Sequence, residues 1–440
     1  MWNVVGSRSP RLCDRSLRRD VLRVGVLTGG GLGLADLLRQ RAVAAPAEAV
    51  RVRSVIHIFL GGGPSHFETF DPKPEAPADI RGPYSPIATS NPGLFICETL
   101  PQLAKIAHLY SVVRSCCHDN SGHGGGHRYV TTGYKSASPE FEAPHDYPGM
   151  GCIVSRVRGA MRGGMPTLMQ MGTDNDCLPA FLGPACGPFN VYSTGKPVGL
   201  EIHPAIKLSR LEDRRSLKRS FDSMQRAAES RLVMDGMDEL ERQALEMLRS
   251  TRAHDAFDLQ KEPKETRDRY GDHAFSKMAL LARRFVQAGA GFVSIRMGSW
   301  DHHGNAGGTV TSGMKENAPP MDRAVATLLE DLHEQGLLES TLVLLWGEFG
   351  RTPRINSSQG RDHWPQAMSV LIAGGGLKAG QVIGTTNRKG EFPIDRAVSP
   401  ADILATVYRQ LGIDPARQFV NGAGRPISIL SHGEALPELI

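Results

Sequence analysis

The chain has 440 residues, a length that suits one large α/β domain or two smaller domains. Its formal net charge is +5, but the excess lies in residues 1–45, which hold eight of the 51 Arg and Lys residues and three of the 46 acidic residues. The remaining residues hold 43 of each kind, so their balance argues against a nucleic-acid partner.

The N-terminal segment has the three parts of an export signal. Arg18 and Arg19 are adjacent, a Gly-rich apolar run covers 24–38, and small residues at 42–44 offer a cleavage site. This order resembles a twin-arginine signal more than a basic N-terminal helix. The run is too short for a permanent membrane span, and Asp36 interrupts it. We therefore expect residues 1–45 to direct export to the periplasm or beyond.

The first predicted strand covers 55–60 and ends in a turn at 61–63. His66, Glu68 and Asp71 follow it, and a Pro-rich surface loop continues to residue 93. Apolar residues at helical spacing then predict a helix over 100–110, and Val112 and Val113 predict a second strand. Ligands of open α/β sheets bind beyond the carboxyl ends of strands, which is where these polar residues stand.

Histidines are concentrated in the next segment, residues 116–136. The pattern predicts a helix that ends near Gly133, and His123 and His127, four residues apart, would share one face of it. A Gly-rich turn that opens a helix presents free N–H groups, which bind anions. Because the glycines at 124–126 disfavour a helix start, a histidine-bearing loop without a ligand remains an equal alternative.

The middle of the chain predicts a helix within 146–158, a strand at 165–172, and two helices of an insertion over 208–257. The Leu and Met residues of this insertion indicate packing. Helices at 265–270, 273–287 and 321–335 then alternate with buried strands at 292–297 and 341–346. This alternation predicts a parallel α/β sheet.

Each of these two later strands is followed by charged residues and histidines, including the types that bind metal ions. Asp301, His302 and His303 follow the first, while Glu348, Arg351, Arg361, Asp362 and His363 follow the second. Asp, Glu and His are the ligands of Zn²⁺, Mn²⁺ and similar ions. With the end of the strand at 55–60, three strand ends supply such residues, which favours a metal site over a solvated loop with an Arg–Glu ion pair.

The C-terminal part predicts a hairpin and a helix. A strand at 368–373, the glycines at 374–376 and a second strand at 378–383 form the hairpin, which lacks the context of a dinucleotide fingerprint. Ser399 and Pro400 open a helix over 399–413. Six of the seven cysteines lie beyond residue 45 and would either pair, as Cys177 with Cys186, or stay free and buried.

Several segments together resemble the DUF1501 proteins: GGGPSHFETFDPKPEAPADIRGP, HRYVTTGY, WDHHGN, GEFGRTPRIN and GRDHWP. These exported bacterial proteins are grouped with the alkaline phosphatase and sulfatase superfamily. The resemblance implies one domain over 46–440, an alkaline-phosphatase-like α/β sandwich with a mostly parallel central sheet, helices on both faces and the helical insertion. It also implies one or two divalent ions (Zn, Mn, Ca or Mg) and hydrolysis of phosphate or sulfate esters.

Mapped by motif, Asp301 and His303 match the Asp/His ligand pair of the superfamily, Glu348 stands where an Asp ligand is usual, and His363 matches the late His ligand. At 61–63 the chain has glycines where the superfamily places an acidic ligand. The resulting candidate metal ligands are Asp301, His303, Glu348, Asp362, His363, His66, Glu68 and His127.

The nucleophile departs from the sulfatase pattern, because no Cys/Ser-x-Pro-x-Arg motif is present. This counts against a formylglycine sulfatase. Aligning Thr132 and Gly133 with the Thr-Gly of that motif places His123 near the nucleophile position, and Ser121 is the nearest hydroxyl. A His nucleophile, hydroxide held by the metal and loss of catalysis all stay open. Arg351 or Arg361 would bind the anion.

The leading hypothesis is an exported metal-dependent hydrolase of small-molecule or polysaccharide esters. The alternative is an envelope binding or structural protein that keeps the metal site without turnover. An oxidoreductase is a weaker third hypothesis, because the Gly runs lack a G-x-G-x-x-G context. The sequence does not indicate an oligomeric state.

Overall fold

The structure is a computed structural model. It describes residues 52–135, 146–159, 161–162, 164–172, 178–192, 194–195, 242–243, 246–247 and 249–440. The predicted export segment, residues 1–45, and most of the predicted helical insertion, residues 208–257, lie outside these ranges.

The core element is an eight-stranded sheet with the order β14-β4-β13-β10-β1-β9-β7-β8. Neighbouring strands run parallel except around β13, which is antiparallel to β10 and β4. The sheet is therefore mostly parallel, as predicted. Its strands are β1 (Ser54–Phe59), β4 (Tyr110–Cys116), β7 (Leu168–Met171), β8 (Phe189–Val191), β9 (Phe292–Arg296), β10 (Thr341–Trp346), β13 (Met368–Gly374) and β14 (Val382–Ile383).

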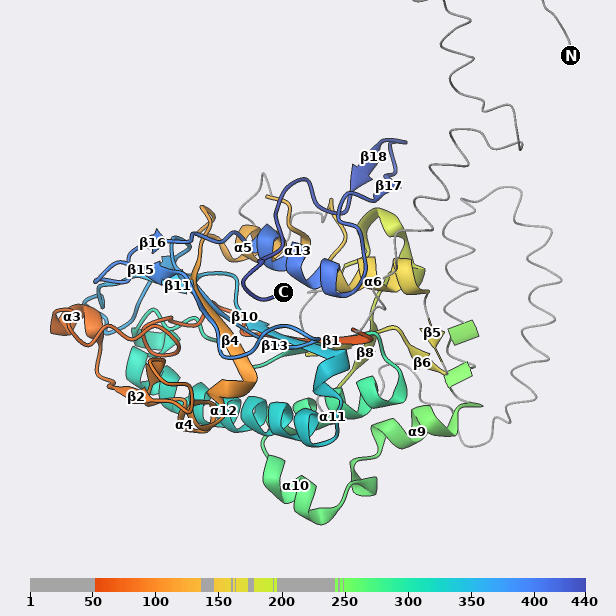
Figure 1. Cartoon of the computed structure of the whole chain (residues 1–440), viewed down its shortest axis with the longest axis horizontal. Helices are drawn as coiled ribbons and strands as arrows, with labels where there is room; N and C mark the ends of the chain where they lie inside the picture. The colour runs from red at the N-terminus through yellow and green to blue at the C-terminus, as the bar shows by residue number, and fades with distance from the viewer. Residues whose placement is uncertain are drawn as a thin grey trace, which may run out of the picture. The chain divides into compact units, whose positions relative to one another are not determined.

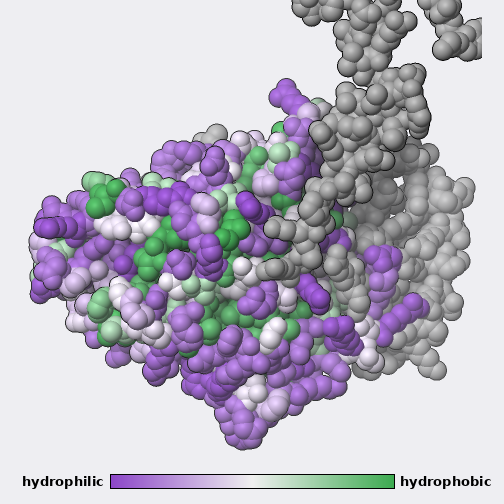
Figure 2. All heavy atoms as spheres, viewed as in Figure 1, coloured by the Kyte–Doolittle hydropathy of each residue, from purple (hydrophilic) through white to green (hydrophobic). Residues whose placement is uncertain are grey.

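Helices cover both faces of the sheet (Figure 1). On one face lie α11 (Ala274–Ala288) and α12 (Val310–Glu334), and on the other lie α5 (His123–Thr132), α6 (Met150–Arg158) and α13 (Pro400–Gln410). On the face viewed in Figure 2, hydrophobic residues gather in a band across the middle, bordered by hydrophilic residues. This arrangement confirms the predicted α/β class.

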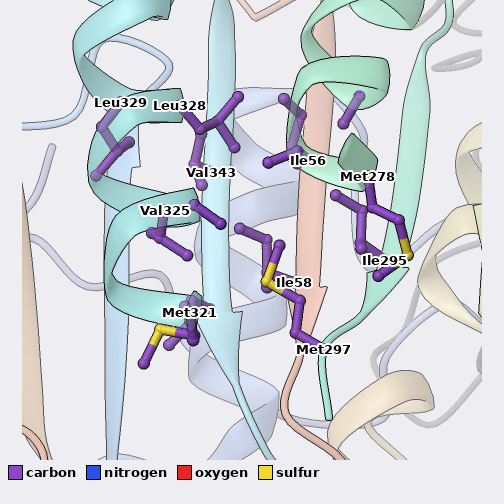
Figure 3. Packing of buried hydrophobic residues seen from close by; sticks show 14 of the residues in the cluster. Ile56, Ile58, Met278, Ile295, Met297, Met321, Val325, Leu328, Leu329 and Val343 are labelled. Atoms are coloured by element: carbon purple, nitrogen blue, oxygen red, sulfur yellow. The ribbon is translucent and has the colours of Figure 1, made fainter. Parts of the chain in front are cut away.

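The central strands are buried on both faces. In β1, Ile56 and Ile58 belong to the core under α11 and α12, while Val55 and Phe59 belong to the core on the opposite face. Figure 3 shows Ile56 and Ile58 on the strand beside Val343 of β10, with Leu328 of α12 next to Val343. All six residues of β1 and all six of β10 are buried, which explains their nearly continuous apolar sequences.

Short elements surround this sheet. They are α3 (Ala78–Arg81), α4 (Pro101–Lys105), α9 (Thr251–Phe257), α10 (Lys264–Tyr270), β2 (Pro86–Ala88), β3 (Phe95–Cys97), β5 (Met161–Arg162), β6 (Met165–Pro166), β11 (Gly350–Arg351), β12 (His363–Trp364), β15 (Thr385–Thr386), β16 (Pro393–Asp395), β17 (Gln418–Val420) and β18 (Pro426–Ser428). Among the described helices, none is long and apolar enough to cross a membrane.

The predicted hairpin at 368–383 is wrong. Gly374, Gly375 and Gly376 have φ values of 68°, 63° and 72° and carry the chain away from β13. The following strand, β14, then pairs in parallel with β4, which lies between β13 and β14 in the sheet.

The predicted helix over 100–110 is shorter in the structure. The helix α4 ends at Lys105, a 3₁₀ turn covers Ala107–Leu109, and Tyr110 already begins β4. The strand continues through the buried residues Val112 and Val113, and the strand preference of aromatic and β-branched residues accounts for the early change.

The structure tests part of the prediction that the cysteines either pair in disulfides or stay free. Cys97, Cys116, Cys117 and Cys186 are free thiols, and Cys177 lies outside the described residues.

Candidate metal centre

Three adjacent strands deliver the polar residues to one edge of the sheet. In the order β10-β1-β9, all three run parallel, so the loops after them start side by side. These loops carry Glu348, Gly62 and Asp301 in turn. Two more residues complete the cluster: His123 begins α5, and His363 begins β12, which pairs with Arg351 of β11.

Asp301 is the centre of the cluster. Its Oδ1 atom lies 2.8 Å from His303 Nε2 and 3.0 Å from His363 Nε2. Its Oδ2 atom lies 3.3 Å from His123 Nε2. The Nε2 atoms of His303 and His363 are themselves 3.0 Å apart. Nitrogen and oxygen atoms of three imidazoles and one carboxylate thus converge on a small volume.

The second nitrogen of each imidazole contacts an oxygen. His123 Nδ1 lies 2.7 Å from Glu348 Oε1, His303 Nδ1 lies 2.7 Å from Asp362 Oδ1, and His363 Nδ1 lies 2.7 Å from the Ser121 carbonyl oxygen. Carboxylates and carbonyls only accept hydrogen bonds, so each Nδ1 atom carries the proton. In the neutral imidazoles, the Nε2 lone pairs then point at Asp301.

Three lone pairs and a carboxylate that face one another repel, unless protons or a metal cation lie between them. Metal-ligating histidines have this same arrangement, because they donate their other N–H group to a carboxylate or a carbonyl. Suitably placed ligand atoms of His123, Asp301 and His363 all lie within 4.8 Å of one another. The donor set therefore fits a divalent cation.

Glu348 gives a second test of this fit. Its Oε1 atom accepts hydrogen bonds from His123 and, at 2.8 Å, from the backbone N–H of Gly62. Its Oε2 atom is buried and has no hydrogen-bond partner among the described residues. A buried carboxylate oxygen without a donor is costly, so this atom also fits a nearby divalent cation.

Gly62 is required by close packing. Its φ is +100°, and a Cβ atom there would lie 2.7 Å from the backbone nitrogen of Asp301 and 2.8 Å from that of Trp300. Gly62 thus lets the loops after β1 and β9 touch.

Hydrogen bonds dominate the electrostatics of the centre. Burial alone lowers the pKa of His123, but the hydrogen bonds to Asp301 and Glu348 outweigh it and raise the pKa to about 9. Without a metal, His123 is therefore protonated on both ring nitrogens at neutral pH and donates from Nε2 to Asp301, and a cation in the cluster would replace that proton. Burial raises the pKa of Asp301, yet hydrogen bonds from His123, His363 and Arg351 hold that pKa well below its usual range. Burial also raises the pKa of Glu348, but the hydrogen bond from His123 outweighs burial and lowers this pKa. Both carboxyl groups are therefore ionised at neutral pH.

Arg351 braces the loops. Its guanidinium is 2% exposed and donates 2.6 Å to Asp301 Oδ1, 2.8 Å to the Gly63 carbonyl and 2.9 Å to the Arg361 carbonyl. It also donates to the carbonyls of Gly62 and Trp300. All three guanidinium nitrogens thus donate hydrogen bonds within the protein. Arg351 therefore holds Asp301 in place and has no pair of N–H groups available to bind a substrate anion.

Glu68 and Arg361 lie together elsewhere, and the structure does not bring them into the cluster. Arg361 is 1% exposed and donates to both Glu68 oxygens, with one contact at 2.7 Å. Its other contacts are the carbonyls of Thr352, Pro353 and Ile80. This pair is a buried structural unit, which corrects the expectation of an anion-binding Arg361 and a metal-binding Glu68.

Two further predicted residues also differ in placement. His66 is buried, with Nε2 2.9 Å from the Gly390 carbonyl, and burial lowers its pKa to about 4. Ser121 reaches the cluster through its carbonyl, which contacts His363, and its predicted role as a hydroxyl nucleophile gains nothing from that contact.

A cavity of about 310 Å³ opens beside the cluster. Its walls include His127, whose ring centre lies 5.0 Å from that of Phe59. Arg296 also lines it, and the sequence did not predict it as a site residue, although a charged residue at the end of a buried strand is a signal for one. The lining residues are Phe59, Gly62, His123, His127, Arg296, Ser299, Asp301 and Glu348.

The chain matches one family model over most of its length. The family is described as "Protein of unknown function (DUF1501)", and the match covers residues 52–440. No curated protein matches the sequence.

Solved structures with a similar fold are distant in sequence. A crystal structure of Ps i-CgsB with k-i-k-neocarrahexaose has 10% identity and a TM-score of 0.41, over 82% of this chain and 72% of that chain. Phosphonate monoester hydrolase SpPMH from Silicibacter pomeroyi has 12% identity and a TM-score of 0.39, over 82% and 74%. A protein of the alkaline phosphatase superfamily from Vibrio parahaemolyticus has 10% identity and a TM-score of 0.39, over 83% and 67%.

Proposed function

We propose that this chain, which belongs to the DUF1501 family, is a metal-dependent hydrolase of phosphate or sulfate esters. The metal ligands in this proposal are His123, Asp301, His303 and His363. The observation that carries it is the shared geometry of the three imidazoles, each with Nδ1 held by an oxygen at 2.7 Å and Nε2 turned toward Asp301.

This ligand set changes the roles expected from the sequence. Glu348 and Asp362 become the hydrogen-bond acceptors that orient His123 and His303, while His123 moves from candidate nucleophile to candidate ligand. Three imidazoles and one carboxylate favour Zn²⁺ or Mn²⁺ over Ca²⁺ and Mg²⁺, which prefer oxygen ligands throughout.

A divalent ion held there would polarise an ester oxygen and stabilise the charge that develops on it. The chain's own residues supply the rest. Arg351 and the Gly62 N–H group fix Asp301 and Glu348, and the cavity gives an ester group access to the same side chains. Export through residues 1–45 is part of the same proposal.

Elemental analysis tests the metal centre. The purified chain is reconstituted with Zn²⁺ or Mn²⁺ and desalted, and we expect about one to two equivalents of bound metal per chain. His363→Ala and His303→Ala should each lose most of this metal while far-UV circular dichroism stays unchanged. His108→Ala is the matched control, because His108 is exposed and its hydrogen bonds are with Ser90, away from the cluster. Equal metal content in wild type and both variants would contradict the ligand assignment.

Turnover separates the two leading hypotheses. The metal-loaded chain is assayed with p-nitrophenyl phosphate and p-nitrophenyl sulfate beside His363→Ala. Hydrolysis that disappears in the variant supports the enzyme, since a metal centre of this kind contributes several kcal/mol to the transition state. Bound metal without hydrolysis of either ester would favour the binding protein.

A further inference from the structure

The cavity beside the metal centre is lined by two carboxylates and one guanidinium. The carboxylates are those of Asp301 and Glu348. Carboxylates at close range repel an anion. The guanidinium in the lining belongs to Arg296, whereas Arg351 and Arg361 are absent from the lining.

Arg296 is positioned by the backbone of two neighbouring strand ends. It is the last residue of β9, after four buried residues, and is itself half-buried. A Cβ atom at Gly61, just after β1, would lie 2.3 Å from Arg296 Cζ and within 2.6 Å of both terminal nitrogens. A Cβ atom at Gly172, just after β7, would lie 2.9 Å from Arg296 Cβ.

Gly61 is informative because its backbone does not need a glycine. Unlike Gly62 and Gly63, it does not have a left-handed φ. The guanidinium of Arg296 therefore occupies the space that any other side chain at position 61 would take. The absence of a side chain at Gly61 therefore leaves room for the guanidinium of Arg296 beside the ends of β1 and β9.

We propose that Arg296 binds the non-bridging oxygens of the phosphoryl or sulfuryl group of the substrate, an inference that rests on the proposed hydrolase function. The planar fork of a guanidinium matches two oxygens of a tetrahedral oxyanion. Arg296 shares the cavity with His123 and Asp301, so one anion can reach the cation and the metal ligands together. The substrate class is then an ester with at least one anionic tetrahedral centre.

Inorganic phosphate is the probe for this site. Its affinity for the metal-loaded chain is measured by isothermal titration calorimetry at low salt, and metal content is measured on the same samples. Arg296→Gln should weaken phosphate binding by about 10- to 100-fold, because charge-assisted hydrogen bonds are lost, with metal content unchanged. Arg354→Gln is the control, since Arg354 is an exposed arginine whose ion-pair partner is Asp79. A change of less than about twofold in Arg296→Gln would overturn the inference.

Gly61→Ala tests the position of the guanidinium without removing its charge. The added Cβ atom must displace Arg296, so phosphate binding should again weaken while the metal ligands stay intact. This variant decides the case in which Arg296→Gln loses metal: retained metal and unchanged phosphate affinity in Gly61→Ala would then count against Arg296. The metal proposal is tested independently by the metal content of the same samples. If the wild type binds no metal but Arg296→Gln still binds phosphate more weakly than the wild type, the metal centre is refuted and the anion site is supported.

Discussion

At the scale of single residues, the second nitrogen of each histidine is as informative as the first. His303 Nδ1 contacts Asp362, and Asn356 donates to the same carboxylate. The side chain of Asp362 is 55% exposed, so its main effect on His303 is to orient the imidazole ring and not to bury it. Its negative charge fixes the tautomer that presents Nε2 and would make the His303 ring a better donor to the proposed metal.

Removing this acceptor should weaken metal binding without unfolding the chain. Asp362→Ala leaves all four proposed ligands in place, and we expect metal affinity to fall by about 10- to 100-fold. Competition with a chromophoric chelator measures the affinity. Asp79→Ala, which removes an exposed carboxylate paired with Arg354, should leave it unchanged. Equal affinities in Asp362→Ala and wild type would show that Asp362 does not support His303.

Residue types at the site were predictable from the sequence, but their partners were not. Asp301, His303 and His363 stand where a strand end predicts a ligand, and the structure brings them together. Arg361 follows the same strand end, yet it turns to Glu68, which lies 293 residues away in the chain. Local sequence shows where a side chain begins, whereas the long-range partner depends on how distant loops meet.

At the scale of elements, α12 shows why helix boundaries are hard to place. The sequence predicts a start at Met321, after two prolines, but the helix begins at Val310, where Thr309 and Ser312 form a capping box. Pro319 and Pro320 remove two backbone donors from the helix interior. Pro319 is exposed and Pro320 is half-buried, so water can serve carbonyls that lose their partners.

The same helix holds α4 through Asp322. The carboxyl oxygens of Asp322 accept 2.8 Å hydrogen bonds from the backbone N–H groups of Gln102 and Leu103. Burial raises the pKa of Asp322 to about 6, and the two N–H groups oppose that shift only in part. The folded chain therefore binds this proton more tightly than an unfolded chain, in which an Asp has a pKa of about 3.9.

A raised pKa in the folded state makes stability fall as pH rises. The contribution of protonated Asp322 should be complete below about pH 4 and lost as pH rises through about 6, a change of roughly 2–3 kcal/mol in the free energy of unfolding. Asp322→Asn cannot titrate, so its stability relative to wild type should rise over this interval. Urea denaturation from pH 4.5 to 7.5, in the presence of a chelator, measures both proteins. A constant difference between them would contradict the raised pKa.

At the scale of the whole molecule, sheet order explains how the site forms. The strands β10, β1 and β9 are neighbours although 341–346, 54–59 and 292–296 are far apart in sequence. Alternating helices and strands predicted the parallel class, which needs only local patterns. The insertion of β4 between β13 and β14 was not predictable in this way, because sheet order is decided by contacts between distant segments.

This topology links metal binding to the stability of the whole sheet. The proposed ligands come from three separate elements, namely α5, β12 and the loop that follows β9. An unfolded chain would therefore not hold them together. A ligand that binds only the folded state stabilises it by about 2.7 kcal/mol at a free concentration of 100 times its Kd. Thermal denaturation of the metal-loaded chain should therefore show a Tm that falls on addition of EDTA.

The variant His363→Ala makes this test specific. Its Tm should lie near that of the chelator-treated wild type and should not respond to EDTA, because the coupling between metal and folding has been removed. An equal fall in both proteins would mean that the stabilising ion binds outside the cluster around Asp301. A Tm that is independent of EDTA in the wild type would mean that the converging imidazoles are held by protons and hydrogen bonds alone, which is the arrangement expected of a binding protein that has lost its metal.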